Sequence, residues 1–274
     1  MIYQSCKVCG GAVSLFHTAF ELLECNNCGL IFYKHQLDSA YVKELYDKLY
    51  NQSEDYSEFK NQAAQLQAGT QPHLGYNKNK ILRGITRRRV KSFVEVGAGV
   101  GIVGNYLQKR KFVYDGIELD AEAARLAKTA NINIVNESFH YLTNYHNKDA
   151  VISFEVLEHI DDLQLAFKLI NQCLKPGGYL GFSVPNFTRY YNVPESQRGN
   201  SIGQAPPPVH INFFTVENLR KIVTLFGFEV LHLRARAYPS LSLKTQGLYK
   251  KLLQSAKGQY HGATILCIAK KRAV

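Results

Sequence analysis

The feature that most constrains the fold is a change of rhythm at Ser92, where short apolar runs begin to alternate with amphipathic stretches. Such alternation is typical of a mostly parallel sheet covered by helices on both faces. We expect strands at 93–96, 113–118, 132–135, 150–154, 179–184, 228–233 and 264–269. We expect helices at 102–108, 121–129, 163–173 and 215–226, the last one capped by Thr215. The predicted fold class is therefore α/β, with a doubly wound sheet.

The loop after the first of these strands is rich in glycine. Gly97-x-Gly99-x-Gly101 lies between a strand and a helix, where backbone N–H groups can face a ligand. The residues from Gly99 to Gly104 also satisfy the G-x-G-x-x-G pattern of dinucleotide sites. Dinucleotide sites and S-adenosylmethionine sites both have an acidic residue at the end of the next strand, where it binds ribose hydroxyls. Glu118 occupies this position. The loop by itself therefore leaves two cofactors open, NAD and S-adenosylmethionine.

Glu95, two residues before Gly97, is the residue that distinguishes between these two cofactors. A carboxylate at this place repels a pyrophosphate but attracts a cofactor that carries an ammonium and a sulfonium. An NAD-dependent enzyme is therefore disfavoured.

Four of the six cysteines form two pairs, Cys6-x₂-Cys9 and Cys25-x₂-Cys28, separated by fifteen residues. This spacing is typical of a zinc ribbon, in which two tight turns present four thiolates to one ion. A site closed by four protein ligands has no position for water, so the predicted zinc is structural. A redox pair would not explain why the spacing occurs twice.

The chain divides into three predicted parts: a zinc ribbon at 1–37, a helical connector at 38–91 that contributes to the ligand site, and a catalytic domain at 92–274. A loop rich in Pro, Gly, Asn and Ser spans 185–209, and a stretch of this kind is usually a lid or a substrate-binding loop. A Lys-rich amphipathic helix is expected at 248–255.

Charge is concentrated in two zones of a chain whose formal net charge is +11. Seven Lys and Arg and no acid lie between Lys78 and Lys91, and twelve lie between Arg198 and the C-terminus against Glu217 and Glu229. Two basic zones on a near-neutral body suggest an anionic partner, such as a phosphate-bearing substrate or nucleic acid. A merely solubilising surface is the alternative.

No apolar run approaches the roughly 20 residues needed to span a bilayer. The N-terminus has no charged start followed by an apolar stretch, so we expect no signal peptide and a cytoplasmic location.

Several blocks downstream of the glycine loop carry a family resemblance. They are Glu155-Val-Leu-Glu-His159, Leu174-Lys-Pro-Gly-Gly178, His210-Ile-Asn-Phe-Phe and Gly227-Phe-Glu-Val230. With Glu118 and the glycine loop, the chain from residue 93 to about 269 resembles the class I S-adenosylmethionine-dependent methyltransferases. The N-terminal part resembles a subgroup that places a zinc ribbon before this domain and often acts on sugars, polysaccharide precursors or natural products. The resemblance implies a Rossmann-like, mostly parallel sheet of seven strands.

The resemblance also implies roles for residues of this chain. Glu95, Gly97, Gly99 and Gly101 would surround the methionine part of S-adenosylmethionine, and Glu118 would hold its ribose. The adenine would lie against three residues, Leu119, Ser138 and Phe139, although the family often has an acid at the position of Ser138. Phe154 and Glu155 would lie where the cofactor meets the acceptor.

The candidates for a catalytic acid or base are chosen by their ordinary pKa. An oxygen acceptor gains from a base, and histidine titrates nearest to neutral pH. His159 and His210 are the candidates, with a hydrogen-bonded structural histidine as the alternative for each.

The leading hypothesis is methyl transfer to a small molecule, with a phosphate-bearing acceptor suggested by the basic zones and O-methylation favoured. An RNA methyltransferase is the second, although the ribbon itself is not basic, and a non-catalytic cofactor-binding protein is the third. The sequence specifies neither the acceptor nor the oligomeric state.

Overall fold

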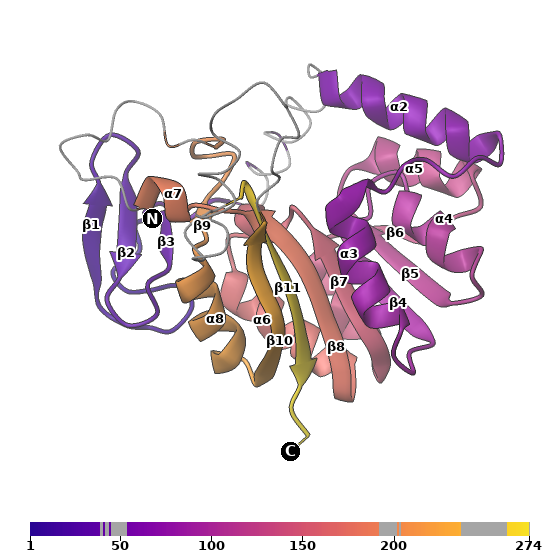
Figure 1. Ribbon diagram of the computed structural model, residues 1–274. Helices are drawn as coiled ribbons and strands as arrows, with labels where there is room; N and C mark the ends of the chain where they lie inside the picture. The colour runs from indigo at the N-terminus through magenta and orange to yellow at the C-terminus, as the bar shows by residue number, and fades with distance from the viewer. Residues whose placement is uncertain are drawn as a thin grey trace, which may run out of the picture.

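The computed structural model describes residues 1–38, 41, 44, 54–191, 202, 204–236 and 262–273. Among these residues one seven-stranded sheet forms the body of the molecule, in the order β10-β11-β8-β7-β4-β5-β6 (Figure 1). The strands are β4 (Ser92–Val96), β5 (Val113–Glu118), β6 (Ile134–Asn136), β7 (Lys148–Phe154), β8 (Leu174–Pro185), β10 (Phe228–Arg236) and β11 (Thr264–Lys271). Neighbouring strands from β6 to β8 are parallel, and β11 runs antiparallel between β8 and β10. The predicted Rossmann-like, mostly parallel seven-stranded sheet is confirmed.

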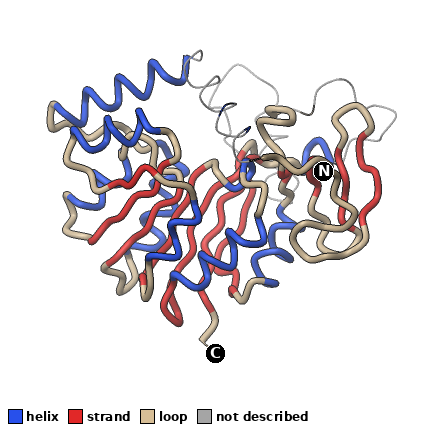
Figure 2. The backbone as a smooth tube through the Cα atoms, turned by 180° about the vertical axis from the view of Figure 1, so that it is seen from behind, coloured by secondary structure: helices blue, strands red, loops and turns tan. Residues whose placement is uncertain are grey.

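Helices cover both faces of this sheet, as Figures 1 and 2 show from opposite sides. Successive strand residues point to opposite faces, so buried strands need apolar residues at nearly every position. In β4, Phe93 packs in one core cluster and Val94 in the other. The first cluster contains apolar residues of α3 (Gly75–Thr86), α4 (Ile102–Gln108) and α5 (Ala121–Thr129), and the second those of α6 (Leu163–Cys173) and α8 (Val216–Leu225).

The helix boundaries follow from local signals. Three helices, α4, α5 and α6, begin and end where the sequence predicts. Asp162 caps α6, and Thr215 with Asn218 forms a capping box at the start of α8. The block Lys175-Pro-Gly-Gly178 after α6 forms an irregular stretch of β8, between Leu174, which pairs with Lys148 of β7, and Tyr179, which pairs with Ala150.

The N-terminal ribbon forms a second sheet, seen beside the main sheet in Figure 1. Its strands are β1 (Val13–His17), β2 (Leu22–Cys25) and β3 (Ile31–Tyr33), joined by β9 (Asn212–Phe213) from far along the chain. Phe32 of β3 faces Asn212 of β9 in an antiparallel pair. The sequence did not predict β9, because two residues carry no periodicity. The division of the chain into domains stays a prediction.

The predicted helical connector contains α2 (Glu54–Gln67) and α3, and residues 41 and 44 are also helical. At the start of the predicted lid loop a short helix, α7 (Thr188–Tyr191), corrects the expectation of a structureless segment. Most of the remaining loop and the expected helix at 248–255 lie outside the described residues. In the part of the chain that is described, no helix combines the length and apolar character required to cross a membrane. The cytoplasmic location stays a prediction.

Candidate functional site

Three adjacent strands end at one edge of the main sheet, and most predicted cofactor residues follow these ends. Val96, at the end of β4, pairs with Ile117 of β5 on one side and with Ser153 of β7 on the other. Gly97, Glu118 and Phe154 therefore start from the same edge. In doubly wound folds this edge is where ligands bind.

The glycine loop has the backbone conformation that only glycine adopts without strain. Gly97, Gly99 and Gly101 have φ angles of 75°, 53° and 85°. A Cβ atom at Gly97 would collide with the side chain of Val156, whereas one at Gly99 would meet no described atom within 4 Å. The loop therefore packs closely at Gly97 and leaves space in front of Gly99 for a ligand.

Glu118 is fixed beside this space. The backbone N–H of Gly99 donates to its Oε2 at 2.6 Å, and that of Asp120 donates to its Oε1 at 2.8 Å. Burial raises the pKa of Glu118, and these two hydrogen bonds oppose the shift. Because each carboxylate oxygen has two lone pairs, Glu118 can still accept hydrogen bonds from ribose hydroxyls.

The predicted adenine residues lie on either side of this edge. Leu119 is 41% exposed directly after Glu118. Phe139 begins the 3-10 helix η1 (Phe139–Asn144) and stacks on His140 with ring centroids 4.2 Å apart, while Ser138 Oγ lies 3.0 Å from His140 Nδ1. Apolar surface is thus present for a ring, and the adenine contacts stay a prediction.

Glu95 is almost fully buried, at 2% exposure, on β4. The hydroxyl of Tyr114 donates to its Oε2 at 2.6 Å. Burial raises the pKa of Glu95 to about 8, although the Tyr114 hydrogen bond and the charge of Lys78 lower it. Glu95 is therefore largely protonated at neutral pH without a ligand, and a cationic ligand nearby would favour its ionised form.

Lys78, on α3, is a site residue that the sequence analysis missed. Its ammonium lies 5.8 Å from the ring centre of Phe154 and interacts with the carboxylates of Glu95 and Glu155. Burial lowers its pKa, and the carboxylates oppose this. Nothing in the sequence distinguishes Lys78 from the other six basic residues of its zone.

The turn after β7 brings acidic groups to the same edge. Glu155 adopts a left-handed conformation with φ 56°, which is uncommon outside glycine and is often found at functional sites. Its N–H donates to Ser183 O at 3.0 Å, and its carboxylate accepts a hydrogen bond from Ser183 Oγ at 2.5 Å. The two contacts hold this conformation against β8.

Both histidine candidates lie together next to this turn. His159 is in the 3-10 helix η2 (Leu157–His159), and its ring centroid lies 4.8 Å from that of His210. Nδ1 of His159 lies 2.8 Å from Val209 O, and Nδ1 of His210 lies 3.0 Å from Gln204 Oε1. Burial lowers the pKa of His159, and burial with the nearby His159 lowers that of His210 to about 4.

Glu158 completes this group and was not predicted as a site residue. It is 1% exposed, and neither carboxylate oxygen has a hydrogen-bond partner within the described parts of the chain. Each of Glu158, His159 and His210 has one side-chain atom that could bind a metal ion, and these three atoms lie within 4.8 Å of one another. Burial and the charge of Glu155 raise the pKa of Glu158. The Glu-x-x-Glu-His spacing is the sequence signal that could have found it.

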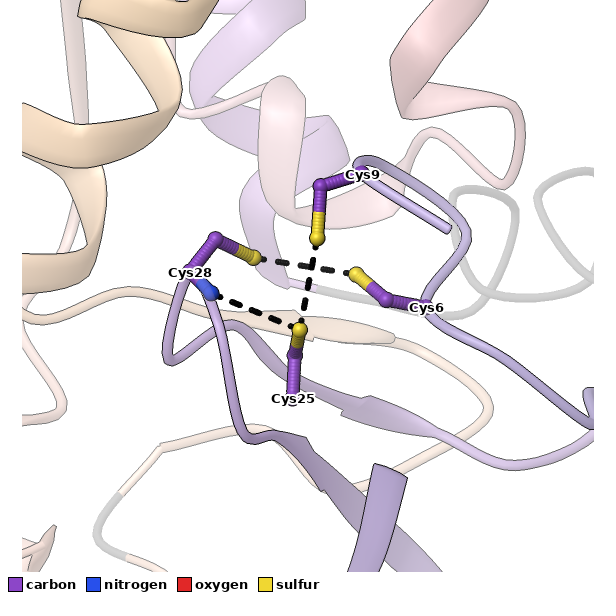
Figure 3. A group of neighbouring side chains, drawn as sticks. All are labelled: Cys6, Cys9, Cys25 and Cys28. Carbon is purple, nitrogen blue, oxygen red and sulfur yellow. Dashed lines mark hydrogen bonds between the residues drawn. The ribbon is translucent and has the colours of Figure 1, made fainter. Parts of the chain in front are cut away.

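The four predicted zinc ligands also meet, with their thiols pointing toward one centre (Figure 3). Cys6 Sγ lies 3.7 Å from Cys28 Sγ, and Cys9 Sγ lies 3.4 Å from Cys25 Sγ. A tetrahedral ion with Zn–S bonds of about 2.3 Å separates its sulfurs by about 3.8 Å. Backbone N–H groups of Val8 and Asn27 donate to Cys6 and Cys25. The four thiols, with no disulfide among them, fit a zinc ion.

The ribbon is packed directly against the segment that carries Glu158 and the histidines. Ile211 N donates to Glu158 O at 2.8 Å, and the Asn212 side-chain amide donates to Leu157 O and Ile160 O, each at 2.8 Å. Since Asn212 also belongs to β9 in the ribbon sheet, the ribbon holds the His210 segment against η2.

The first basic zone lines a groove of about 470 Å³ between α3 and strands β10 and β11. Its positively charged side chains are those of Lys80, Arg83, Arg87 and Arg88. The groove gives the predicted anionic partner a surface with positive charge on several residues.

The fold and the site define the class of protein. A parallel sheet with one antiparallel strand, β11, beside its last parallel strand and a glycine loop after β4 is the Rossmann-like fold of class I S-adenosylmethionine-dependent methyltransferases. The methyltransferase domain family matches residues 70–233, more than half of the chain. The chain belongs to this family.

Relatives and solved structures agree with this assignment. A ubiquinone biosynthesis O-methyltransferase of Citrobacter koseri is 29% identical over 104 residues, which are 35% of this chain and 43% of that protein. The chain thus matches less than half the length of this relative. The [4+2]-cyclase SpnF has a similar fold, with a TM-score of 0.57 and 15% identity over 87% of this chain and 98% of that one. A SAM-dependent methyltransferase of Thermotoga maritima gives a TM-score of 0.52 and 15% identity, over 84% of this chain and 100% of that one.

Proposed function

We propose that the protein transfers the methyl group of S-adenosylmethionine to a hydroxyl of a small-molecule acceptor. The observation that carries the proposal is the open space in front of Gly99, bordered by the fixed carboxylate of Glu118, in a chain of the methyltransferase domain family. Buried Glu95 beside the loop favours a cationic cofactor, because a positive charge nearby stabilises its ionised form. S-adenosylmethionine supplies, when bound, a methyl group on a positively charged sulfur.

The residues of the chain bind and orient the two reactants. Glu95 and the three glycines of the loop surround the methionine part of the cofactor, Glu118 binds the ribose, and Leu119, Ser138 and Phe139 cover the adenine. Phe154 and Glu155 lie where the cofactor meets the acceptor. Because methyl transfer is a single displacement, most of the acceleration comes from this alignment.

The acceptor hydroxyl is received at Glu158, His159 and His210. Transfer to a hydroxyl yields the methyl ether, S-adenosylhomocysteine and one proton. The group that removes this proton has to lie beside the acceptor, and the two adjacent imidazoles meet this requirement. The name of the Citrobacter koseri relative, an O-methyltransferase, supports oxygen as the methylated atom.

Calorimetry with S-adenosylhomocysteine and with NAD tests the cofactor. We expect binding of the first alone, weakened about 10–100-fold in Glu118→Ala because hydrogen bonds to a charged group are lost. Glu217→Ala, which removes a carboxylate 81% exposed on α8, is the matched control and should bind normally. Binding of NAD, or equal affinity in both variants, would contradict the proposal.

The acceptor class is proposed as a sugar, a polysaccharide precursor or a natural product, with a phosphate group received by the basic groove. The same groove is the observation that favours the second candidate, RNA methylation.

Binding and turnover experiments distinguish the candidates. An affinity for RNA near micromolar at physiological ionic strength, falling steeply with salt, would favour RNA as the acceptor. Formation of S-adenosylhomocysteine with hydroxylated small molecules would favour the first candidate. Binding of the cofactor without such turnover would indicate a non-catalytic protein.

We also propose that the four cysteines bind one structural zinc ion. The distances among the sulfurs and the N–H groups that donate to them support this. Metal analysis should find one zinc per chain, and Cys25→Ser should lose it.

A further inference from the structure

The side chain of Glu158 is buried in the proposed acceptor site and has no structural role that its contacts explain. Glu158 is 1% exposed, and both of its oxygens lack a hydrogen-bond partner among the described residues. A buried carboxylate of this kind costs several kcal/mol unless something compensates it. No other residue of the described chain donates a hydrogen bond to it that would explain its presence as a structural residue.

The surrounding side chains are suited to a cation. Nε2 of His159 lies 3.9 Å from Glu158 Oε1, and one donor atom from each of Glu158, His159 and His210 falls within 4.8 Å of the others. Ligands bound at about 2.0–2.2 Å from one ion lie about 3–3.6 Å apart, so small side-chain rotations bring all three into contact with it. The charge of Glu155 is close enough to act on Glu158 and makes the place more negative.

Hydrogen bonds orient both imidazoles for this role. Val209 O can only accept, so Nδ1 of His159 donates to it, and the lone pair of the neutral ring is on Nε2. Gln204 Oε1 accepts from Nδ1 of His210 in the same way. A histidine that binds a metal through one nitrogen usually donates the other N–H to a carbonyl or carboxylate.

We infer that Glu158, His159 and His210 bind a divalent cation, and that the acceptor hydroxyl reaches the reaction by binding to that cation. The inference rests on the proposed methyl transfer and specifies it. Three protein ligands leave coordination positions open, which is the arrangement of a catalytic and not a structural site. A cation binds a hydroxyl oxygen and favours loss of its proton, which then passes to water, because the Nε2 lone pairs of both imidazoles are on the cation. Two imidazoles and one carboxylate suit Mn²⁺, Fe²⁺, Co²⁺ or Zn²⁺.

The open positions also bear on the acceptor. One ion with two open positions would accept two neighbouring oxygens of one molecule, such as a vicinal diol of a sugar or a catechol. The cation would then select the acceptor as well as activate it.

Mn²⁺ titration of the full-length protein, with zinc already in the cysteine site, tests the inference. Mn²⁺ prefers oxygen and imidazole ligands and does not compete for four thiolates, so it reports on the second site alone. Electron paramagnetic resonance should show one bound Mn²⁺ per chain. Enhanced relaxation of water protons should show that water occupies an open position.

Two pairs of variants locate the site. Glu158→Gln and His210→Asn should weaken Mn²⁺ binding at least 10-fold, whereas Glu229→Gln and His146→Asn, at exposed positions elsewhere, should not. Glu158→Gln should also leave the melting temperature unchanged or raise it in metal-free buffer, since no described residue donates a hydrogen bond to the buried carboxyl group that the amide would lose. A lower melting temperature would indicate a structural role.

Binding of S-adenosylhomocysteine to the same samples separates the two proposals. If it binds and neither Mn²⁺ nor Co²⁺ does, the cation site is wrong and the proposed function stands. Equal Mn²⁺ affinity in Glu158→Gln and the native protein would also overturn the cation site. If S-adenosylhomocysteine does not bind, the proposed function fails whatever the Mn²⁺ result.

Discussion

At the scale of single residues, burial decides the charge of Glu95. The residue occupies a strand position that would suit an apolar side chain, and the hydroxyl of Tyr114 donates a hydrogen bond to its carboxylate. The pKa in the folded protein is about 8, above its ordinary value of 4.5. The folded state therefore holds a proton that the unfolded chain releases between these two pH values.

This difference predicts how stability depends on pH. Because the folded protein binds more protons than the unfolded chain, the free energy of unfolding falls as pH rises from 4.5 to about 8. Glu95→Gln keeps the hydrogen bond from Tyr114 but does not titrate. We expect the variant to become more stable than the native protein by about 2–5 kcal/mol at pH 8, and nearly equal to it at pH 4.5. Urea denaturation without cofactor at several pH values measures this.

A stability difference that stays constant with pH would show that Glu95 is ionised throughout. The cofactor provides a second check, since its positive charge favours the ionised carboxylate. Binding of S-adenosylmethionine below pH 8 should release more protons from the native protein than from Glu95→Gln, measured by calorimetry in buffers of different ionisation heat.

At the scale of elements, the short segments η2 and β9 place the histidines, and one carboxylate after η2 fastens the ribbon to them. Asp161 accepts hydrogen bonds from Tyr3 Oη at 3.0 Å, Lys7 Nζ at 3.4 Å and Leu37 N at 3.2 Å. The Lys7 side chain is 2% exposed, and burial lowers its pKa to about 8 although Asp161 raises it. Asp161 is therefore the partner that permits a buried ammonium at this junction.

We expect Asp161→Ala to lower the free energy of unfolding by about 3–5 kcal/mol, because it leaves the buried Lys7 without a counter-charge. Asp162→Ala is the matched neighbour. Asp162 accepts one hydrogen bond, from Leu165 N at the start of α6, and its loss should cost about 1 kcal/mol. Chemical denaturation compares the two. Similar losses in both variants would mean that the ribbon is not held through Asp161.

At the scale of the whole molecule, the ribbon and the main sheet share one core. Three ribbon residues, Val8, Leu30 and Phe32, belong to the same buried cluster as the residues of α6 and α8. Asn218 connects the two parts again, since it caps α8 and donates to Gly29 O at 2.9 Å. The ribbon thus forms one side of the proposed acceptor site, while the glycine loop follows a strand of the main sheet.

Removal of zinc should therefore affect ligand binding at the glycine loop less than ligand binding at His210. Chelation or Cys25→Ser should lower the melting temperature by about 5–10 °C, because the metal provides much of the folding energy of a ribbon. Affinity for S-adenosylhomocysteine should stay within about threefold, since Glu118 is held by the backbone N–H groups of Gly99 and Asp120 in the main domain. Mn²⁺ binding at His210 should fall, because β9 loses its partner strand. Differential scanning calorimetry and binding titrations on zinc-loaded and zinc-free protein measure these effects, and equal loss of both ligands would contradict this separation.

The sequence alone determined the features that local chemistry controls. The boundaries of α4, α5 and α6, the cap at Thr215 and the glycine loop were predicted because periodicity, capping residues and positive φ angles are properties of neighbouring residues. The two cysteine pairs were found for the same reason, since each pair lies within one turn, and their zinc ion stays a prediction. The mostly parallel sheet followed from alternating strands and helices.

Only the tertiary structure decided which distant residues come together at the proposed acceptor site. Lys78 reaches the site because α3 packs on the sheet, and His210 joins His159 because β9 pairs with the ribbon. Glu158 looks in the sequence like any acid on a helical turn, and its character comes from burial without a hydrogen-bond partner in the described structure. These properties depend on long-range packing, which leaves no periodic signal in the chain. The glycine loop thus indicated the cofactor, and the fold brought together the residues that would choose the acceptor.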